Sequence, residues 1–194
     1  MKDKLINPFK YIAGFKALLW GLLAIILTSV FGYITKTHYP TIIDVKIPGP
    51  DFPVWYYLLQ NISNWLVFSL LLYLLSLVVS PSSVRIIDVF GTQALARSPY
   101  LLTSFMGLFN NTLVNLIKEF GAVSYSMKEI VFIVLISVFS LLILIWMIVL
   151  MYNAFSVSAN LRGTKAAVLF TLSLITAYFV TLWLTKTMVQ TIFT

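Results

Sequence analysis

The stretch IVFIVLISVFSLLILIWMIVLMY, residues 130–152, contains no charged residue. A helix needs roughly 20 apolar residues to cross the roughly 30 Å hydrocarbon core of a bilayer, so this stretch predicts a transmembrane helix. A strand of a membrane β-barrel would instead alternate between polar and apolar residues over about ten positions. The stretch does not alternate, and it therefore indicates a helical membrane protein.

The composition of the whole chain agrees with this interpretation. Of its 194 residues, 60% are hydrophobic and 10% are charged, whereas soluble domains average about 45–50% apolar and about 25% charged residues. A chain of this size buries only about 70% of its surface on folding, so a water-soluble fold could not cover so much apolar surface. We therefore expect an all-α, polytopic membrane protein in which residues 1–194 form one domain.

Four further segments are apolar enough to join the first, and together they predict a bundle of five transmembrane helices. The predicted spans are residues 15–33, 55–79, 100–117, 130–152 and 166–185. A signal peptide is the main alternative for the first span, because basic residues precede it. Its apolar run is long for a signal peptide, however, and Thr35-Lys36-Thr37 does not resemble a cleavage site.

The distribution of charge predicts the orientation. With a cytoplasmic N-terminus, the inner segments hold eight Lys and Arg against two Asp, and the outer segments hold five Lys against four acidic residues. This excess of positive charge inside obeys the positive-inside rule, so we expect a cytoplasmic N-terminus and an outside C-terminus. The basic inner face predicts contacts with anionic lipid headgroups rather than with nucleic acid, because no soluble basic face exists.

The connection between the second and third spans predicts an amphipathic helix at the membrane surface, over residues 83–96. Pro81-Ser82-Ser83 is a typical helix start, and Arg85, Asp88 and Thr92 follow at spacings of three and four. Entry of this segment into the bundle is the alternative. In the outer loop, residues 43–47 alternate between apolar and charged positions, which suggests a short strand.

Small residues recur along one face of the first span, which predicts a seam for close helix packing. The partner helix belongs either to the same chain or to another protomer or membrane protein. The seam consists of Ala13, Ala17, Gly21, Ala24, Thr28 and Gly32.

A polar stripe follows the third predicted span. It is either a track for a small solute, ion or lipid headgroup, or a set of hydrogen bonds between helices. No ionisable residue lies in the middle of any span, which argues against a coupled transporter. The candidate stripe consists of Arg97, Ser104, Gly107, Asn110, Asn111 and Asn115.

The residues that most enzymes need are missing. The chain has no Cys, and its single histidine, His38, lies in the outer loop. One imidazole cannot build a His-rich metal site, and the sequence contains no nucleophile-elbow or phosphate-loop motif. We therefore predict no catalytic residue, no metal, no cofactor and no enzymatic activity.

Several of these features together resemble the YIP family (Ypt/Rab-interacting proteins), in particular short bacterial members. Asn7-Pro8 precedes the first span, residues 89–102 resemble the family's small-residue stretch ending in a proline, and Trp146 precedes a polar inner loop. The resemblance implies a non-enzymatic scaffold or organiser of a bacterial cytoplasmic (inner) membrane. Rab binding is not implied, because the aspartate–leucine–aromatic–glycine–proline motif is missing. A small transporter or channel that uses the polar stripe is the alternative function.

Overall fold

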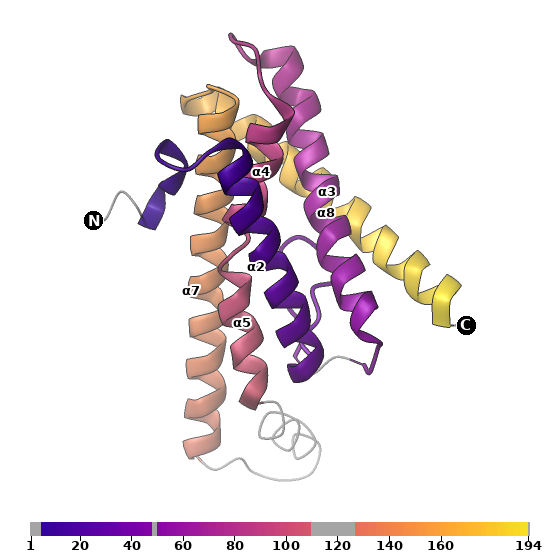
Figure 1. The fold of residues 1–194 in the computed structure, drawn as a ribbon. Helices are drawn as coiled ribbons and strands as arrows, with labels where there is room; N and C mark the ends of the chain where they lie inside the picture. Colours follow the sequence, from indigo (N-terminus) through magenta and orange to yellow (C-terminus); the bar gives the residue numbers. More distant parts are fainter. Residues whose placement is uncertain (1–4, 48–49, 110–126, 194) are drawn as a thin grey trace.

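The computed structural model describes residues 5–47, 50–109 and 127–193, and these residues are almost entirely helical (Figure 1). They contain no β-strand; the predicted strand at residues 43–47 is reduced to a single antiparallel bridge between His38 and Lys46. In chain order, the elements are η1 (Pro8–Lys10), α2 (Gly14–Thr35), α3 (Val54–Val79), α4 (Ile86–Ala96), α5 (Tyr100–Met106), η2 (Gly107–Phe109), α7 (Met127–Ser158) and α8 (Gly163–Phe193).

Four of the helices are long and apolar enough to cross a membrane. They are α2, α3, α7 and α8, which match the first, second, fourth and fifth predicted spans. The prediction of an all-helical membrane protein is therefore confirmed. The third predicted span begins, as expected, at Tyr100 with the short helix α5. Its remainder, residues 110–117, lies outside the described residues.

Helix α7 exposes more of its surface than the other three long helices. Only 18% of its most apolar window is buried, against 22–33% for α8, α2 and α3. Buried side chains gather in its C-terminal half, where Met147, Met151 and Phe155 join the core. This asymmetry follows from the sequence of α7, because large branched side chains on every face cannot all find a partner helix.

Helix α4 lies inside the bundle, packed against α2, α3 and α7. This position differs from the surface helix predicted for residues 83–96. Its buried residues include Val89, Gln93 and Ala94, and Trp65 of α3 donates a hydrogen bond to the carbonyl of Phe90 at 3.0 Å. Figure 1 shows α4 and α5 following one another along the length of α7, with α2 beside them.

Two glycines allow α4 to approach α2 closely. A Cβ atom added at Gly21 of α2 would lie 2.5 Å from both the Cβ of Ala94 and the backbone nitrogen of Leu95. A Cβ at Gly91 of α4 would lie 2.7 Å from the carbonyl oxygen of Gly14. Because glycine has no side chain at these two positions, the backbones of α2 and α4 pack directly against each other. The amphipathic pattern of α4 thus reflects a small-residue face, which favours burial over a place on the membrane surface.

Replacing Gly21 by Ala tests this contact. The added methyl group meets backbone atoms, which cannot rotate away, so we expect a loss of about 1–3 kcal/mol in stability. The measurement is the Tm of the purified protein in detergent. Val30→Leu, a change at an exposed position of the same helix, serves as the control and should leave the Tm unchanged. Equal Tm values for both variants would contradict close α2–α4 packing.

Candidate functional site

The path from α4 to α5 is interrupted at Arg97, Ser98 and Pro99. Proline has no backbone N–H and its ring clashes with the carbonyl four residues earlier, so a regular helix cannot continue through it. The backbone forms tighter turns instead. The N–H of Ser98 donates to the carbonyl of Leu95 at 3.0 Å, and the N–H of Tyr100 donates to the carbonyl of Arg97 at 3.0 Å. This interruption lies among the other helices and places Arg97 between α4 and α5.

The guanidinium group of Arg97 is buried, and its two terminal nitrogens lack hydrogen-bond partners in the part of the chain that the structure describes. The residue is 3% exposed, and neither Nη1 nor Nη2 has a hydrogen-bond partner among the described residues. Its Cζ atom lies 5.1 Å from the centre of the Tyr100 ring, which provides a cation–π contact. The C-terminal end of α4 adds a favourable dipole. These two contacts do not replace the hydrogen bonds that a guanidinium makes in water, so the arrangement is costly.

A second unsatisfied group lies one helical turn before Arg97. The side-chain amide of Gln93 donates to the carbonyl of Met151 on α7 at 3.0 Å, while its Oε1 is buried without a partner. Residues four apart lie on the same face of a helix. The unsatisfied atoms of Gln93 and Arg97 therefore lie on the same side of this part of the chain.

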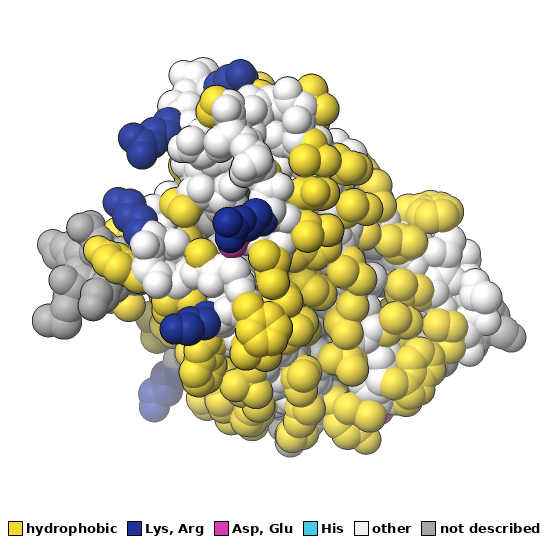
Figure 2. Space-filling model, turned by 45° about the horizontal axis from the view of Figure 1, so that its top comes forward, with side chains coloured by type: hydrophobic (Ala, Val, Ile, Leu, Met, Phe, Trp, Pro, Cys, Tyr) yellow, Lys and Arg dark blue, Asp and Glu magenta, His cyan; other side chains and the backbone are white. Residues whose placement is uncertain are grey.

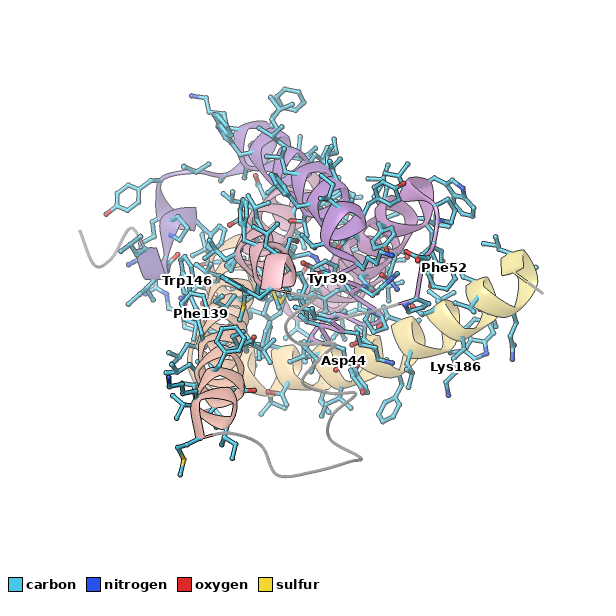
Figure 3. The ribbon with its side chains drawn as sticks, turned by 90° about the horizontal axis from the view of Figure 1, so that it is seen from below. Tyr39, Asp44, Phe52, Phe139, Trp146 and Lys186 are labelled. Carbon is cyan, nitrogen blue, oxygen red and sulfur yellow. The ribbon has the colours of Figure 1, made fainter. Side chains whose placement is uncertain are left out.

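The segment that follows α2 enters the bundle and reaches α5. Tyr39 is fully buried, and Figure 3 shows it among the helices when the molecule is seen from below. Its hydroxyl donates to the carbonyl of Tyr100 at 3.0 Å and lies 2.6 Å from the hydroxyl of Ser104 and 3.1 Å from that of Thr103. The hydroxyl of Tyr100 in turn donates to the carbonyl of Ile42. The tyrosines therefore join the loop between α2 and α3 to α5.

Amide side chains of α3 satisfy the backbone of this buried loop. Gln60 accepts a hydrogen bond from the backbone N–H of Tyr39 at 2.9 Å. Asn64 donates to the carbonyls of Tyr39 and Thr41 at 2.7 and 3.0 Å. From α8, Thr185 donates to the carbonyl of Pro40 at 2.6 Å. Irregular backbone is tolerated at membrane depth only where protein or water pairs its polar groups, and here protein does so.

Three amide side chains of α3 contribute to the site although they were not predicted from the sequence. Gln60, Asn61 and Asn64 lie within the predicted span 55–79 and are buried. The sequence contained a signal for this role, because amide side chains within an apolar helix need hydrogen-bond partners in the bundle. Asn61 donates to the hydroxyl of Ser29 on α2 at 3.1 Å, so this face of α3 holds both α2 and the loop.

The predicted polar stripe is partly described. Arg97, Ser104 and Gly107 are buried on the inner side of α4, α5 and η2. A Cβ at Gly107 would collide with the side chains of Thr35 and Thr37, so η2 packs closely on the end of α2. The other members of the stripe lie outside the described residues: Asn110, Asn111 and Asn115.

The predicted seam of α2 turns toward the neighbouring helices of the same chain. Its buried members are Ala17, Gly21, Thr28 and Gly32. Ala24 is half-buried, and Ala13 is exposed just before the helix begins. The carbonyl of Thr28 accepts a hydrogen bond from Ser104 at 3.3 Å. The seam thus contributes to the wall of the same site that contains Arg97.

A cavity of about 240 Å³ opens beside this site, between the outer loop, α5 and α7. Its walls are mostly apolar and include Ile43, Val45 and Leu144, while Tyr100 and Thr103 line it from α5. Tyr100 thus contacts the cavity and also covers the guanidinium of Arg97. The ring separates an apolar opening from a buried cation.

The beginning of the outer loop is held by His38 and by an ion pair. The Nε2–H of His38 donates to the carbonyl of Pro50 at 2.8 Å, and its ring stacks on Tyr57 with centroids 4.4 Å apart. Lys36 and Asp51 form a salt bridge with a closest N–O distance of 2.5 Å. Burial lowers the pKa of His38 below its ordinary value of 6.5, although the bond to Pro50 and the charge of Asp51 oppose this shift.

Within the described ranges, no group of three or more His, Asp or Glu side chains could hold a metal ion. The buried polar groups of the described residues are amides, hydroxyls, the imidazole of His38 and the guanidinium of Arg97, with no carboxylate among them. Such groups can bind and orient an anion or a polar solute by hydrogen bonding.

Comparisons with known proteins add no identification: no protein-family model, no curated protein and no solved structure matches this chain.

Replacing Tyr39 by Phe tests the connection between the loop and α5. The change removes the buried hydroxyl that bonds to Tyr100, Thr103 and Ser104 of α5, so we expect a loss of about 0.5–1.5 kcal/mol in stability, the net worth of a typical hydrogen bond. Thermal unfolding in detergent measures it. Tyr33→Phe, which alters an exposed tyrosine of α2, should have no effect. If Tyr39→Phe also leaves the Tm unchanged, the loop does not depend on this hydroxyl.

A lower pH should destabilise the fold around the loop between α2 and α3, because His38 becomes protonated. Because the pKa of His38 is lower in the folded protein than in the unfolded chain, the unfolded chain binds a proton first as the pH falls. The Tm should therefore fall as the pH decreases below about 6.5. His38→Gln should reduce this dependence, as measured by thermal unfolding at a series of pH values. An unchanged pH profile in His38→Gln would contradict the assignment.

Proposed function

We propose that this protein is a small transporter or channel that binds an anion inside the membrane, with Arg97 as the group that holds the anion. The observation that supports the proposal is the buried guanidinium of Arg97, whose two terminal nitrogens have no hydrogen-bond partner among the described residues. A planar guanidinium presents paired donors that match carboxylate, phosphate and other oxyanions. Charged groups inside membranes that lack a protein partner mark substrate or ion pathways.

The depth of Arg97 supports this role. With α4, α5 and η2 counted together as a third crossing, the segment 86–109 is about 35 Å long, enough to cross the bilayer. Arg97 lies about 17 Å from its start, close to the middle. On this proposal, the chain crosses five times with the N-terminus inside, and an interrupted helix forms the third crossing. Interrupted helices at the midplane are a common binding-site architecture of transporters.

The surrounding groups favour a small anion that moves without coupling to a proton. The hydroxyls of Tyr39, Ser104 and Thr103 are neutral and bond to one another and to backbone carbonyls, and the buried described residues include no Asp or Glu that could carry a proton. The cost of burying Arg97 unpaired supplies a reason for binding, because an anion would remove it. The apolar cavity at Tyr100 suggests entry from the side, where movement of one ring would open the site.

The alternative, a scaffold of the YIP type, receives less support. Its main argument was a small-residue seam available to a partner, but Gly21 and Gly32 pack within the chain, against Ala94 of α4 and against the carbonyl of Thr37. The comparisons found no YIP relative. Three further proposals come from the sequence. The protein has no enzymatic activity, it assembles with itself or with another membrane protein, and it resides in a bacterial cytoplasmic membrane.

An efflux assay tests the transport proposal. Proteoliposomes are loaded in turn with chloride, nitrate, phosphate or acetate, and anion release is measured. We expect release above that of empty liposomes for at least one anion, and a decrease of at least tenfold in Arg97→Gln. Arg85→Gln removes a positive charge from an exposed position and serves as the control. Equal release from Arg97→Gln and the unaltered protein for every anion would contradict the proposal.

Replacing Arg97 should decrease transport but increase the stability of the protein. Replacing Arg97 by Met removes an unpaired buried charge and retains much of the side-chain volume, so stability should rise by about 1–4 kcal/mol. The test compares the Tm of both proteins in detergent without added anions. A residue kept at a cost to stability is typical of a functional site. A lower Tm for Arg97→Met would indicate that Arg97 has a structural role instead.

A further inference from the structure

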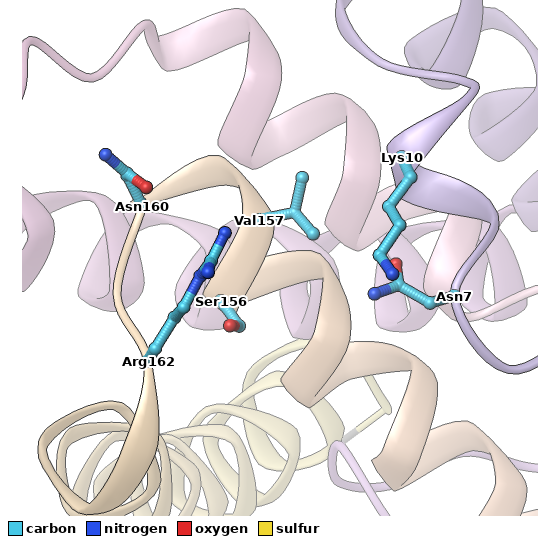
Figure 4. Close-up of a pocket in the computed structure, with 6 residues that line it drawn as sticks. All are labelled: Asn7, Lys10, Ser156, Val157, Asn160 and Arg162. Carbon is cyan, nitrogen blue, oxygen red and sulfur yellow. The ribbon is translucent and has the colours of Figure 1, made fainter. Parts of the chain in front are cut away.

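A second cavity, of about 550 Å³, opens where α7 turns into α8, far along the bundle from the end of α5 (Figures 1 and 4). Figure 4 shows Asn7 and Lys10 on one side of it and Asn160 and Arg162 on the other. Ser156 and Val157 of α7 lie between them. The described lining thus combines two cations with polar side chains and contains no acidic residue.

The side that holds Arg162 is ordered by the end of α7. Asn160 adopts a left-handed conformation with φ of 49°, which asparagine tolerates better than most residues. The backbone N–H of Leu161 donates to the carbonyl of Ser156 at 3.1 Å, and the Ser156 hydroxyl donates to the carbonyl of Leu161 at 2.6 Å. This turn fixes the position of the Arg162 backbone at the edge of the cavity.

The side that holds Lys10 is attached to α7 by separate contacts. Asn153 donates a hydrogen bond to the carbonyl of Ile6 at 2.9 Å, and Trp146 donates to the carbonyl of Leu5 at 3.1 Å. Phe9, next to Lys10, is 2% exposed and belongs to the core. Both walls are therefore held in place independently of any ligand.

The Asn7 amide has a buried oxygen, Oδ1, without a hydrogen-bond partner. The oxygen and nitrogen of an amide exchange places by a half-turn of the side chain. With an anion in the cavity, the amide NH₂ would face the ligand beside the cations of Lys10 and Arg162. The oxygens of an anion would thus accept hydrogen bonds from the N–H groups of three side chains, which is the chemistry of phosphate binding.

The surroundings of the cavity indicate a lipid as the source of the phosphate. Leu5, Ile6 and Tyr11 flank Lys10 and expose 50–64% of their surface. Figure 2, in which this end comes forward, shows Lys and Arg side chains gathered on it and hydrophobic side chains covering the flanks. This is the arrangement expected at headgroup depth, with acyl chains alongside the apolar residues.

We infer that this cavity binds the phosphate group of an anionic phospholipid through Asn7, Lys10 and Arg162. The lipid holds the N-terminal segment and the α7–α8 turn together, and its acyl chains lie along Leu5 and Ile6. This inference is independent of the anion proposed at Arg97, which lies on different elements.

Native mass spectrometry of the detergent-solubilised protein tests the inference, with phosphatidylglycerol or phosphatidylcholine added in separate samples. We expect tighter binding of phosphatidylglycerol, and at least a tenfold loss of its affinity in the double variant Lys10→Gln, Arg162→Gln. Asn7→Leu, which leaves the charge intact, should also weaken it. The double variant Arg85→Gln, Lys165→Gln removes the same charge from exposed positions outside the cavity and should retain the affinity.

Three results would overturn the inference. Equal binding of both lipids by the unaltered protein would show that the site does not recognise the anionic headgroup. Equal losses in the two double variants would show general attraction to a basic surface. Inorganic phosphate that raises the Tm as strongly as phosphatidylglycerol does would identify a free anion as the ligand. Arg97→Gln should bind phosphatidylglycerol normally, which separates this test from that of the proposed transport function.

Discussion

The structure depends on one constraint: every backbone polar group that leaves a regular helix inside the bundle must find a partner there. Lipid offers no hydrogen bonds, so an unpaired amide or carbonyl costs several kcal/mol. Two irregular segments of the described chain lie within the bundle, in the loop around Tyr39 and at the interruption before Pro99. The two irregular segments lie against each other, and the Tyr39 and Tyr100 hydroxyls pair with backbone carbonyls across the contact.

Close packing of small residues makes room for this arrangement. The glycines of α2 and α4 bring the two helices into direct backbone contact, which draws the interrupted segment into the middle of the bundle. There α3 offers Gln60 and Asn64 to the loop. These backbone groups are thus satisfied by neutral side chains, whereas the two terminal nitrogens of the buried Arg97 guanidinium have no hydrogen-bond partner among the described residues. The contrast between a paired backbone and an unpaired cation is the reason to assign a function to this residue.

Much of the fold could be predicted from the sequence, because four helices each contain an apolar stretch long enough to cross a membrane. The place of α4 could not. Arg85, Asp88 and Thr92 have the spacing of a surface helix, yet Gly91 and Ala94 on another face matter more, since Gly91 packs against Gly14 and Ala94 against Gly21 of α2. Periodicity shows which residues share a face and does not show which neighbour covers it. Arg97 was recognised as part of a polar stripe, whereas its burial depends on Pro99 and on a loop some 60 residues earlier.

The most direct test of this account asks whether the segment 86–96 lies within the bundle. The chain has no Cys, so single cysteines can be placed at Ala94 and Ala96, which are fully buried, and at Ser82, which is exposed. Labelling rates with a bulky, membrane-impermeant maleimide are then measured in proteoliposomes. The account predicts rapid labelling at position 82 and protection at positions 94 and 96. Labelling of all three at similar rates would place α4 on the membrane surface and contradict the account.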